Sequence, residues 1–323
     1  MKISGEFTLS TDLGGTNTKI ALVKNEKNII ARRILSTEKY KGKKLLINKI
    51  AATINDLLKS NNVKKGKIKA VGIGVAGPVD FKKGLIHRLV NVKGWHNVYL
   101  KRILSRKLKL KVYMDNDVNL VTLGEYKYGA GRGTKNMICI TLGTGVGGGI
   151  ILDGNLYRGS GFTAGEVGHI PINVNGPRCN CGGKACLERY VSNYCIVEEA
   201  KKLVRKRPNS KILKFADGKP SKITPKVISE AAHLGDKLAI KIWKETGVYI
   251  GVALTGLVNV FNPECIVIGG GVSLAGDVLF NSIRETVARR AMKEPAQKVK
   301  IVPAELGNDA GLIGASILAT KGK

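Results

Sequence analysis

The chain has 323 residues and a mass of 34.7 kDa, which is enough for two domains with a substantial core, and its apolar content of 43% is typical of a globular protein. The first fifteen residues hold no continuous apolar segment, which argues against a signal peptide, and the longest apolar run (247–261) is too short to span a bilayer. We therefore expect a soluble, cytoplasmic protein with reduced cysteines.

The formal charge of +30 is spread along the chain. The stretches 39–69, 82–111 and 201–226 each carry ten basic residues against at most one acid. Such a field attracts polyanions, but these stretches hold few aromatic residues for stacking on single strands. Two interpretations stay open: a Lys-rich proteome, or a polyanionic ligand such as nucleotide, polyphosphate or nucleic acid.

The apolar periodicity and the glycine turns predict alternating strands and helices. In chain order we expect strands at 7–11, 18–23 and 28–35, a helix at 45–59, strands at 68–75 and 111–114, and a helix at 117–128. The pattern then restarts with strands at 136–142 and from 150, a helix at 236–260, a strand at 264–268, a helix at 274–292, a strand at 298–302 and a helix at 310–321. A strand, a glycine turn and a second strand occur once in each half, which indicates an internal repeat.

Each half has a glycine turn suited to binding phosphate. Asp12-Leu13-Gly14-Gly15-Thr16 and Gly143-Thr144-Gly145 both follow a predicted strand. Glycine turns offer backbone N–H groups and let an anion approach closely, and the two threonines add hydroxyl donors. Two such turns could hold a triphosphate, with Asp12 near its Mg²⁺ through water. A third glycine loop, Gly269, Gly270 and Gly271, follows a buried-type strand and strengthens the expectation of nucleotide binding.

Two other nucleotide motifs can be weighed against this interpretation. Gly143, Gly145 and Gly148 match the spacing of the dinucleotide fingerprint, with Glu166 about 20 residues further on. That fingerprint must open a helix, whereas 150–152 begins a strand, so we do not expect a dinucleotide-binding fold. The chain contains no Gly-x4-Gly-Lys-Ser/Thr, so a P-loop is excluded.

The candidate general base lies in Asp115-Asn116-Asp117, between a predicted strand and a helix. Asn116 or Asp117 could simply cap the helix. Strand ends in α/β proteins are also where catalytic side chains project, and phosphoryl transfer to an alcohol needs a carboxylate that accepts the hydroxyl proton. We expect Asp117 to be this base, with Asn116 beside it as a partner of the acceptor.

Three cysteines and one histidine form a complete set of ligands for structural zinc. His169, Cys179, Cys181 and Cys186 have the spacing His-x9-Cys-x-Cys-x4-Cys, which is not that of a nucleic-acid-binding finger. Reduced core thiols or a disulfide are the alternatives. Zinc here would fix a loop that carries Glu166 and Glu188, and these carboxylates together with His169 could bind the hydroxyls of a small polar ligand.

These motifs resemble the ROK family of sugar kinases and repressors, members of the actin-like ATPase superfamily. The resemblance runs from Asp12 to Ala315, and its most specific part is Gly-Glu-x-Gly-His followed by Cys-x-Cys-Gly and Cys-x-Glu, from Gly165 to Glu188. It implies an α/β fold with two domains, a duplicated ribonuclease-H-like architecture and a zinc-stabilised loop. The smaller domain would hold 1–115 plus the C-terminal helix (about 304–323), and the larger domain 116–303 would hold the zinc loop and the adenosine motif.

The resemblance also implies roles by position. Asp12, Gly14, Gly15 and Thr16 match the first phosphate motif, Gly143, Thr144 and Gly145 the second, and Gly269, Gly270 and Gly271 the adenosine motif. Asp117 matches the catalytic base and His169, Cys179, Cys181 and Cys186 the zinc ligands. The sugar-contacting positions are Gly77, Asn91, Asn116, Glu166, His169 and Glu188. The cofactors implied are ATP with Mg²⁺ and structural Zn²⁺.

Two departures from the family pattern bear on these roles. Ala185 stands where the family usually has Gly, which puts the local turn in question but not the ligands. Leu89 and Val90 precede Asn91, where many relatives have a small polar residue and Pro, which weakens any inference about the sugar.

The function implied is ATP-dependent phosphorylation of a hexose at the 6-hydroxyl, with glucose as the expected substrate and a homodimer as the expected assembly. Kinases of N-acetylmannosamine, N-acetylglucosamine, fructose and allose share these residues, and the charge leaves polyphosphate open as a donor. A sugar-responsive repressor is disfavoured, because eleven residues before Asp12 cannot hold a helix-turn-helix. We therefore expect neither a specific nucleic acid nor a membrane as a partner.

Overall fold

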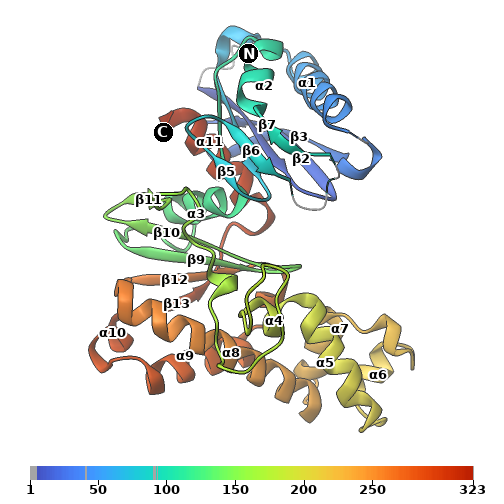
Figure 1. The fold of residues 1–323 in the computed structure, drawn as a ribbon. Coiled ribbons are helices and arrows are strands. Elements are labelled where there is room, and N and C mark those ends of the chain that lie inside the picture. Colours follow the sequence, from blue (N-terminus) through green and yellow to red (C-terminus); the bar gives the residue numbers. More distant parts are fainter. Residues whose placement is uncertain (1–5, 41, 90–91, 93, 323) are drawn as a thin grey trace. The chain divides into compact units, whose positions relative to one another are not determined.

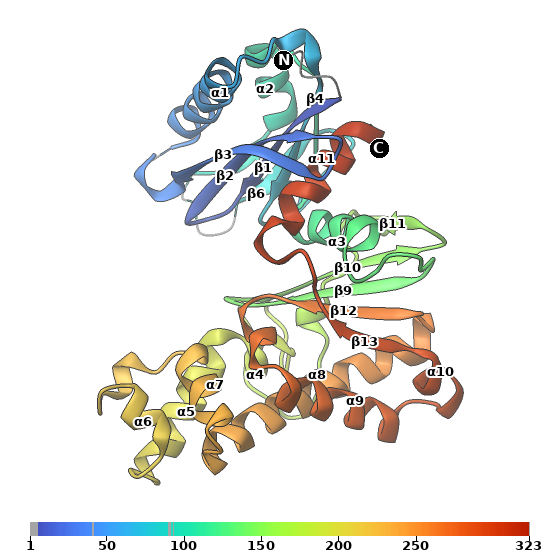
Figure 2. The same ribbon diagram turned by 180° about the vertical axis from the view of Figure 1, so that it is seen from behind.

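The computed structural model describes residues 6–40, 42–89, 92 and 94–322, and Figures 1 and 2 show its ribbon from opposite sides. The strands are β1 (Phe7–Leu13), β2 (Asn17–Lys24), β3 (Asn28–Ser36), β4 (Ile68–Val75), β5 (Val79–Asp80), β6 (Leu85–Arg88), β7 (His96–Val98), β8 (Val112–Asn116), β9 (Met137–Leu142), β10 (Val146–Leu152), β11 (Asn155–Tyr157), β12 (Cys265–Gly269) and β13 (Lys300–Pro303). The helices are α1 (Lys43–Ser60), α2 (Leu100–Leu108), α3 (Asp117–Tyr128), α4 (Glu188–Val191), α5 (Asn193–Arg205), α6 (Lys211–Phe215), α7 (Pro225–His233), α8 (Lys237–Phe261), α9 (Asp277–Arg290), α10 (Lys293–Lys298) and α11 (Ala310–Lys321). The described part of the chain holds no helix that is both long and apolar enough to cross a membrane.

Two five-stranded sheets have the same strand order. The first runs β3-β2-β1-β4-β8 and the second β11-β10-β9-β12-β13. In the first sheet β2 is antiparallel to β1 and to β3, while β1, β4 and β8 are parallel. In the second, β10 and β11 are antiparallel, while β9, β12 and β13 are parallel. The mixed sheets confirm the α/β part of the predicted fold class, and the shared order agrees with the predicted internal repeat.

Most predicted elements occur within a few residues of their expected bounds, but some details differ. The second glycine turn is short, because β10 already begins at Val146. The helix expected at 274–292 is broken at Gly276 (φ 71°) into a 3-10 turn (Gly271–Ala275) and α9. The small antiparallel sheet β5-β6-β7 and helices α2, α4, α5, α6, α7 and α10 were not predicted.

The described chain forms two compact units. The first comprises the residues up to Gly133, Gly149–Ala164 and the residues from Glu305 onward, and the second comprises Thr134–Gly148 and Gly165–Ala304. Helix α3 therefore belongs to the first unit. The division into duplicated domains (1–115 plus about 304–323, and 116–303) stays a prediction.

Alternation along the strands separates the two faces of the first sheet. Leu9 of β1 and Ile20 and Leu22 of β2 belong to the core formed with α1 and α2, whereas Ala21 and Val23 pack with Leu312 of α11 on the other face. Thr8, also on that face, forms a 2.6 Å hydrogen bond with Ser316 of α11. Figures 1 and 2 show α1 and α2 on one side of this sheet and α11 on the other.

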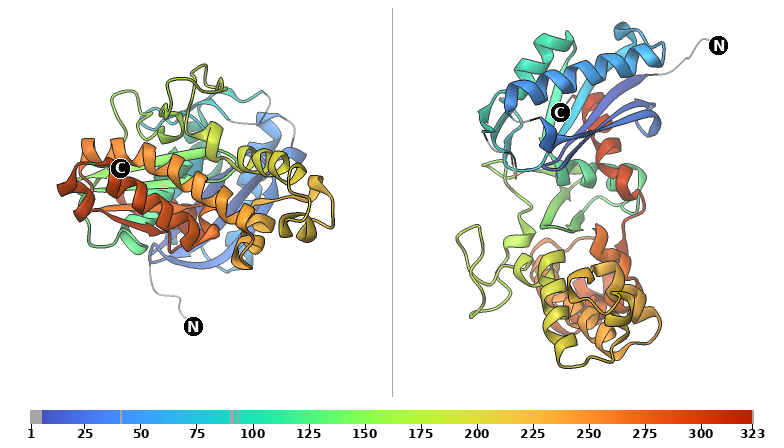
Figure 3. Two further views of the ribbon diagram at one scale, coloured as in Figure 1. Left: turned by 90° about the horizontal axis from the view of Figure 1, so that it is seen from below. Right: turned by 90° about the vertical axis from the view of Figure 1, so that its right-hand side faces the viewer.

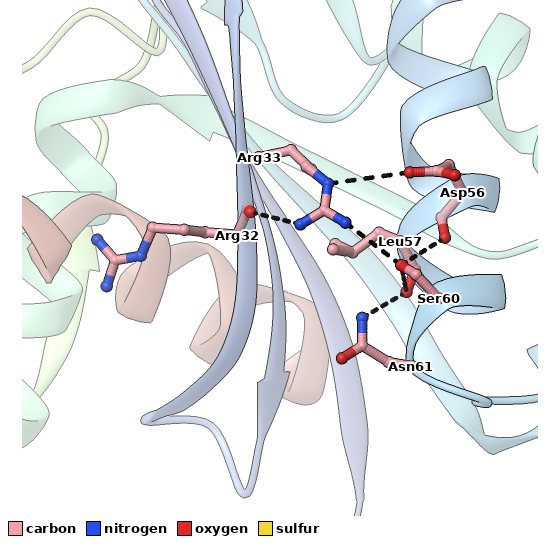
Figure 4. Close-up of polar contacts among 6 residues, drawn as sticks. All are labelled: Arg32, Arg33, Asp56, Leu57, Ser60 and Asn61. Atoms are coloured by element: carbon pink, nitrogen blue, oxygen red, sulfur yellow. Dashed lines mark hydrogen bonds and ion pairs between the residues drawn. The ribbon is translucent and has the colours of Figure 1, made fainter.

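A polar cluster joins the edge strand β3 to the end of α1, as Figure 4 shows. The guanidinium of Arg33 donates to Ser60 Oγ (3.4 Å) and to the carbonyl of Arg32 (3.1 Å), and its Nε lies 3.9 Å from Asp56. These side chains are largely exposed, so the cluster contributes little to the free energy of unfolding.

Helices α3 and α11 pack closely because glycines lie where they meet. A Cβ placed on Gly314 of α11 would lie 1.7 Å from the carbonyl oxygen of Leu120 in α3, and one on Gly124 of α3 would lie 2.4 Å from that of Ala310. On the sheet side, a Cβ on Gly72 of β4 would lie 1.9 Å from the carbonyl oxygen of Ala315. No room exists for a side chain at these three positions, so glycine sets the distance between backbones.

The second unit is built on the pair α8 and α9, which lie side by side in Figure 3. Gly247 and Gly251 of α8 permit this approach, since a Cβ on either would lie within 2.6 Å of an α9 side chain. Trp243 is fully buried in α8, and Asp236 caps that helix by accepting the N–H of Ala239 at 2.8 Å. Asp236 also accepts the Ser210 hydroxyl (3.0 Å) and the Lys211 N–H (2.7 Å), which joins α8 to the start of α6.

Candidate active site

The turn from β8 to α3 carries the predicted general base. Asn116 caps the helix, because its Oδ1 accepts the N–H groups of Val118 (2.8 Å) and Asn119 (3.2 Å). Its Nδ2 donates to the carbonyl of Gly77 at 3.4 Å, which brings two predicted sugar-contacting residues together. The capping role belongs to Asn116, so Asp117, at the first helical position, is not needed for it. Asp117 Oδ1 accepts the N–H of Val118 at 3.0 Å.

A buried carboxylate lies directly before this turn. Asp115 Oδ1 accepts the N–H of Asn116 and the Nδ2 of Asn119, both at 2.8 Å. Its Oδ2 accepts the Nε–H of Arg158 at 2.7 Å, and the two side chains are 4% and 15% exposed. The two bonds to Oδ1 fix the backbone and a side chain of the turn, and the bond to Oδ2 pairs the carboxylate with Arg158.

The first glycine loop closes the β1–β2 hairpin. Gly14 donates to the carbonyl of Asn17 at 3.1 Å, and Thr37 fixes the loop by donating to the Gly14 carbonyl at 2.9 Å. Asp12, at the end of β1, lies 3.6 Å from Lys19 Nζ. Burial raises the pKa of Asp12, and Lys19 offsets this only in part. A cation bound beside Asp12 would favour its ionised form.

The second glycine loop is joined to the segment that carries Glu188. Gly143 donates to the carbonyl of Gly145 at 2.9 Å, and its own carbonyl accepts the N–H of Asn193 at 2.8 Å. Glu188 Oε2 accepts the N–H of Val146 at 2.9 Å, and a Cβ on Gly145 would lie 2.6 Å from that oxygen. A predicted sugar-binding carboxylate is therefore bonded to the predicted phosphate loop.

The third glycine loop lies beside the second. Gly269 pairs with Thr141, and Gly270 (φ 89°) packs so closely on Leu142 that a Cβ would lie 2.1 Å from its carbonyl oxygen. Thr144 is exposed and Gly143 and Gly145 are half-buried, so this edge can receive a ligand. The dinucleotide fingerprint is excluded, because the chain after Gly145 continues as β10 and opens no helix.

The four predicted zinc ligands lie together. The ligand atoms of His169, Cys179, Cys181 and Cys186 are all within 4.8 Å of one another. Cys181 Sγ and Cys186 Sγ are 3.6 Å apart, and Cys179 Sγ is 3.8 Å from His169 Nδ1. Four ligands about 2.3 Å from zinc in a tetrahedron would be separated by about 3.8 Å. The donor set and its spacing fit zinc.

The protonation of these thiols bears on how a metal would bind. Burial raises the pKa of the Cys186 thiol to about 12, whereas the N–H of Gly183 lowers the pKa of Cys181. Zinc binds the thiolate, so uptake of the metal must release protons.

The imidazole of His169 is oriented for two contacts. Its Nδ1 faces Cys179, and its Nε2 lies 3.8 Å from Glu166 Oε2. One nitrogen is thus available to a metal while the other lies near a carboxylate that is largely exposed. The two residues before His169 are buried: Gly168 packs against Val146, and Val167 packs against Gly148.

The departure at Ala185 has a structural consequence. This residue is buried and adopts φ 56°, in the left-handed region that glycine enters without steric cost. A non-glycine residue there costs about 1 kcal/mol. The turn is kept despite this cost, because Ala185 N–H donates to Pro177 (2.9 Å) and its carbonyl accepts from Ile172 (3.0 Å).

Sequence reasoning missed several residues that shape these loops. Arg158 follows a short strand as a single arginine and has no recognisable pattern. Asn119 ends the Asn-Asp-x-Asn motif (116–119), but its hydrogen bond to Asp115 was not predicted. Glu125 is fully buried in α3 and accepts the N–H groups of Glu305 (3.1 Å) and Leu306 (2.8 Å), which holds the segment leading to α11. Asn91, predicted to contact sugar, lies outside the described residues.

Taken together, the repeated sheet order and the glycine turn after the first strand of each sheet define an α/β fold of the actin-like ATPase class. The sequence model of the ROK family matches residues 8–322. The chain belongs to the ROK family.

Three known proteins are similar to this chain over most of its length. The glucokinase of Halalkalibacterium halodurans is 38% identical over 98% of this chain and 96% of its own length. The crystal structure of a ROK family glucokinase from Streptomyces griseus in complex with glucose and AMPPNP has a TM-score of 0.83 and 34% identity, covering 98% of this chain and 99% of that one. The xylose repressor of Caldicellulosiruptor bescii is 32% identical over 87% of this chain and 68% of its own length.

Proposed function

We propose that this protein transfers the terminal phosphoryl group of ATP to the 6-hydroxyl of a hexose, with glucose as its substrate. The observation that carries the proposal is the similarity to glucokinases over nearly the whole of both chains. The turn from β8 to α3 supports it, because an Asn cap followed by a half-buried Asp provides the acceptor chemistry that a kinase needs.

At the acceptor, Asp117 would take the proton of the 6-hydroxyl as the oxygen attacks phosphorus. A carboxylate is suited to this role, since proton transfer in the transition state needs a base within hydrogen-bond reach. Asn116 would orient the sugar through its side-chain amide. The oxygen of this amide already accepts the N–H of Val118 in α3. Gly77 and Asn91 are the other sugar-contacting positions that we propose in the first unit.

At the donor, the three glycine loops would bind ATP. Asp12, Gly14, Gly15 and Thr16 would bind phosphate and, through water, Mg²⁺, which neutralises charge on the phosphates when bound. Gly143, Thr144 and Gly145 form the second phosphate loop, and Gly269, Gly270 and Gly271 would receive the adenosine.

In the second unit, zinc would fix the loop that carries the sugar-binding carboxylates. His169, Cys179, Cys181 and Cys186 are the proposed ligands, and their mutual distances support this assignment. Glu166, His169 and Glu188 would accept hydrogen bonds from sugar hydroxyls. The homodimer and the cytoplasmic location stay predictions.

The test is a coupled assay of ADP release with ATP and Mg²⁺ across glucose, fructose, N-acetylglucosamine and N-acetylmannosamine. We expect turnover with glucose to exceed that with the other sugars. Turnover with inorganic polyphosphate in place of ATP would assign a different donor, and no turnover with either donor on any sugar would refute the proposal.

The role of Asp117 can be tested separately. We expect Asp117→Asn to lower kcat by about 10²–10⁴-fold, because it removes the base while keeping the shape of the side chain. The Kd for glucose, measured by calorimetry, should change little. A variant with near wild-type kcat would remove Asp117 from the mechanism.

A further inference from the structure

The buried ion pair between Arg158 and Asp115 is the one strongly buried charge pair that adjoins the proposed acceptor site within the described residues of the first unit. Arg158 comes from the segment after β11, and Asp115 lies in β8, 43 positions earlier. Their N···O distance is 2.7 Å. A charge buried to this extent requires a partner of opposite sign, since taking an unpaired carboxylate out of water is strongly unfavourable.

The arginine is itself held in place from two sides. Its guanidinium lies 4.3 Å from the ring centroid of Phe81, which packs edge-on against Phe162 at 4.9 Å. The carbonyl of Arg158 accepts the N–H of Ala164 at 3.0 Å, so the segment 158–164 folds back on itself. Stacking and hydrogen bonding together restrict this side chain to one orientation, which a lysine could not reproduce.

The carboxylate in turn determines the conformation of the Asn116–Asp117 turn. Asp115 holds the N–H of Asn116 and the side chain of Asn119, while the backbone N–H of Asn119 is bound by Asn116. The turn is thus closed into a ring of hydrogen bonds around Asp115. Without Arg158, the carboxylate would be left buried and uncompensated and would rotate toward water or bind a proton, and either change would break this ring.

We propose that Arg158 is a positioning residue for the phosphoryl acceptor: by pairing with Asp115, it fixes the turn that presents Asn116 and Asp117 to the hexose. This inference rests on the proposed function of that turn. An ion pair with a purely structural role would change only the free energy of unfolding. A positioning residue also changes the rate of the chemical step, because displacing reacting groups by as little as 1 Å lowers that rate.

The experiment compares Arg158→Ala with a matched control, Arg132→Ala. Arg132 also pairs with a carboxylate far away in the sequence, Glu305 at 3.1 Å, but its side chain and that of Glu305 are 61% and 51% exposed. Kinetics are measured at a temperature where circular dichroism shows each variant fully folded. We expect R158A to lower kcat/KM for glucose by about 10–100-fold, with the KM for ATP within twofold of wild type and R132A unchanged.

Chemical rescue separates positioning from general loss of structure. Guanidinium chloride at tens of millimolar, with ionic strength matched by NaCl, should enter the space left in R158A and restore kcat at least threefold. Urea at the same concentration is the neutral planar control and should restore none. Should R158A fail to fold, Arg158→Lys replaces it: the lysine keeps the charge without the Nε–H geometry, and we expect kcat to fall about 3–10-fold.

The outcomes are distinct. A folded R158A or R158K with wild-type kcat and glucose KM overturns the inference, as does a loss in R158A that guanidinium does not reverse. Those results leave the proposed function intact, because wild type remains active. A wild-type protein without turnover on any sugar refutes the proposed function, and the inference with it.

Discussion

Glycine at position 314 sets the distance between α11 and α3, and its replacement by alanine should strongly destabilise the first unit. The added Cβ would lie 1.7 Å from the carbonyl oxygen of Leu120, whereas Cβ contacts shorter than 3.0 Å are essentially never found. The helices would have to separate by about 1.3 Å, and no rotamer change can relieve the overlap, because the obstacle is backbone.

The expected cost is about 3 kcal/mol or more of the free energy of unfolding, the upper end for an overpacked core. In a unit of this size it would lower Tm by roughly 6–12 °C. The matched control is Gly311→Ala in the same helix, where the nearest atom to a Cβ would be Val121 Cγ2 at 3.7 Å. That variant should be more stable than wild type by about 0.5–1 kcal/mol, because alanine favours helix.

The assay is urea denaturation followed by tryptophan fluorescence in a Trp243→Phe background. Trp95 then reports on the first unit alone, since Trp95 and Trp243 are the two tryptophans of the chain and both are fully buried. If G314A matched the W243F parent within about 0.5 kcal/mol, the close packing of α3 and α11 would be wrong.

Three further predictions concern the second unit. Asp236→Ala should cost about 2–3 kcal/mol, because it leaves the N–H groups of α8 and Lys211 without an acceptor. Burial raises the pKa of Asp236, but the hydrogen bonds to these N–H groups outweigh burial and hold the pKa in the folded protein below 3.8. The stabilisation by Asp236 is therefore complete above pH 3.8 and is lost as the pH falls through the pKa of the folded protein. Below that pH, urea titrations of variant and wild type should give the same free energy of unfolding. Ala185→Gly should raise the free energy of unfolding by about 1 kcal/mol, measured in the same way, because it relieves the left-handed φ; no gain would mean that the turn holds no strain. A strong chelator should remove one zinc per chain and weaken glucose binding, as measured by calorimetry. Reloading the protein with zinc should release protons, which a pH indicator detects. Unchanged glucose affinity in the metal-free protein would contradict the role of the loop.

The sequence predicted those parts of the site that depend on local chemistry. Glycine turns after strands, an Asn-Asp pair at a strand end and closely spaced thiols each require particular residue types at fixed spacing, so they can be read without knowing the fold. Arg158 could not be predicted in this way, because its role arises only from the pairing with Asp115 that the sheet creates. The same is true of Glu125, which accepts two N–H groups about 180 positions away.

The fold was predictable where periodicity is strong and less so where elements are short. Strands β1, β4 and β9 and helices α1, α3 and α8 match their expected positions because long apolar patterns define them. Helices α4 and α6 have four and five residues, too few for a periodic pattern to show. The break at Gly276 was missed because apolar residues continue on both sides of it.

The last helix also sets the order in which the protein can mature during synthesis. One face of the first sheet is covered by α11, which supplies Leu312 and Ser316 to it. Ribosomes add about 5–20 residues per second, so roughly 10–40 s separate residue 133 from residue 321. During that interval the sheet β3-β2-β1-β4-β8 lacks the cover that α11 gives this face. Apolar residues such as Ala21 and Val23 would then be open to a chaperone that binds nascent chains.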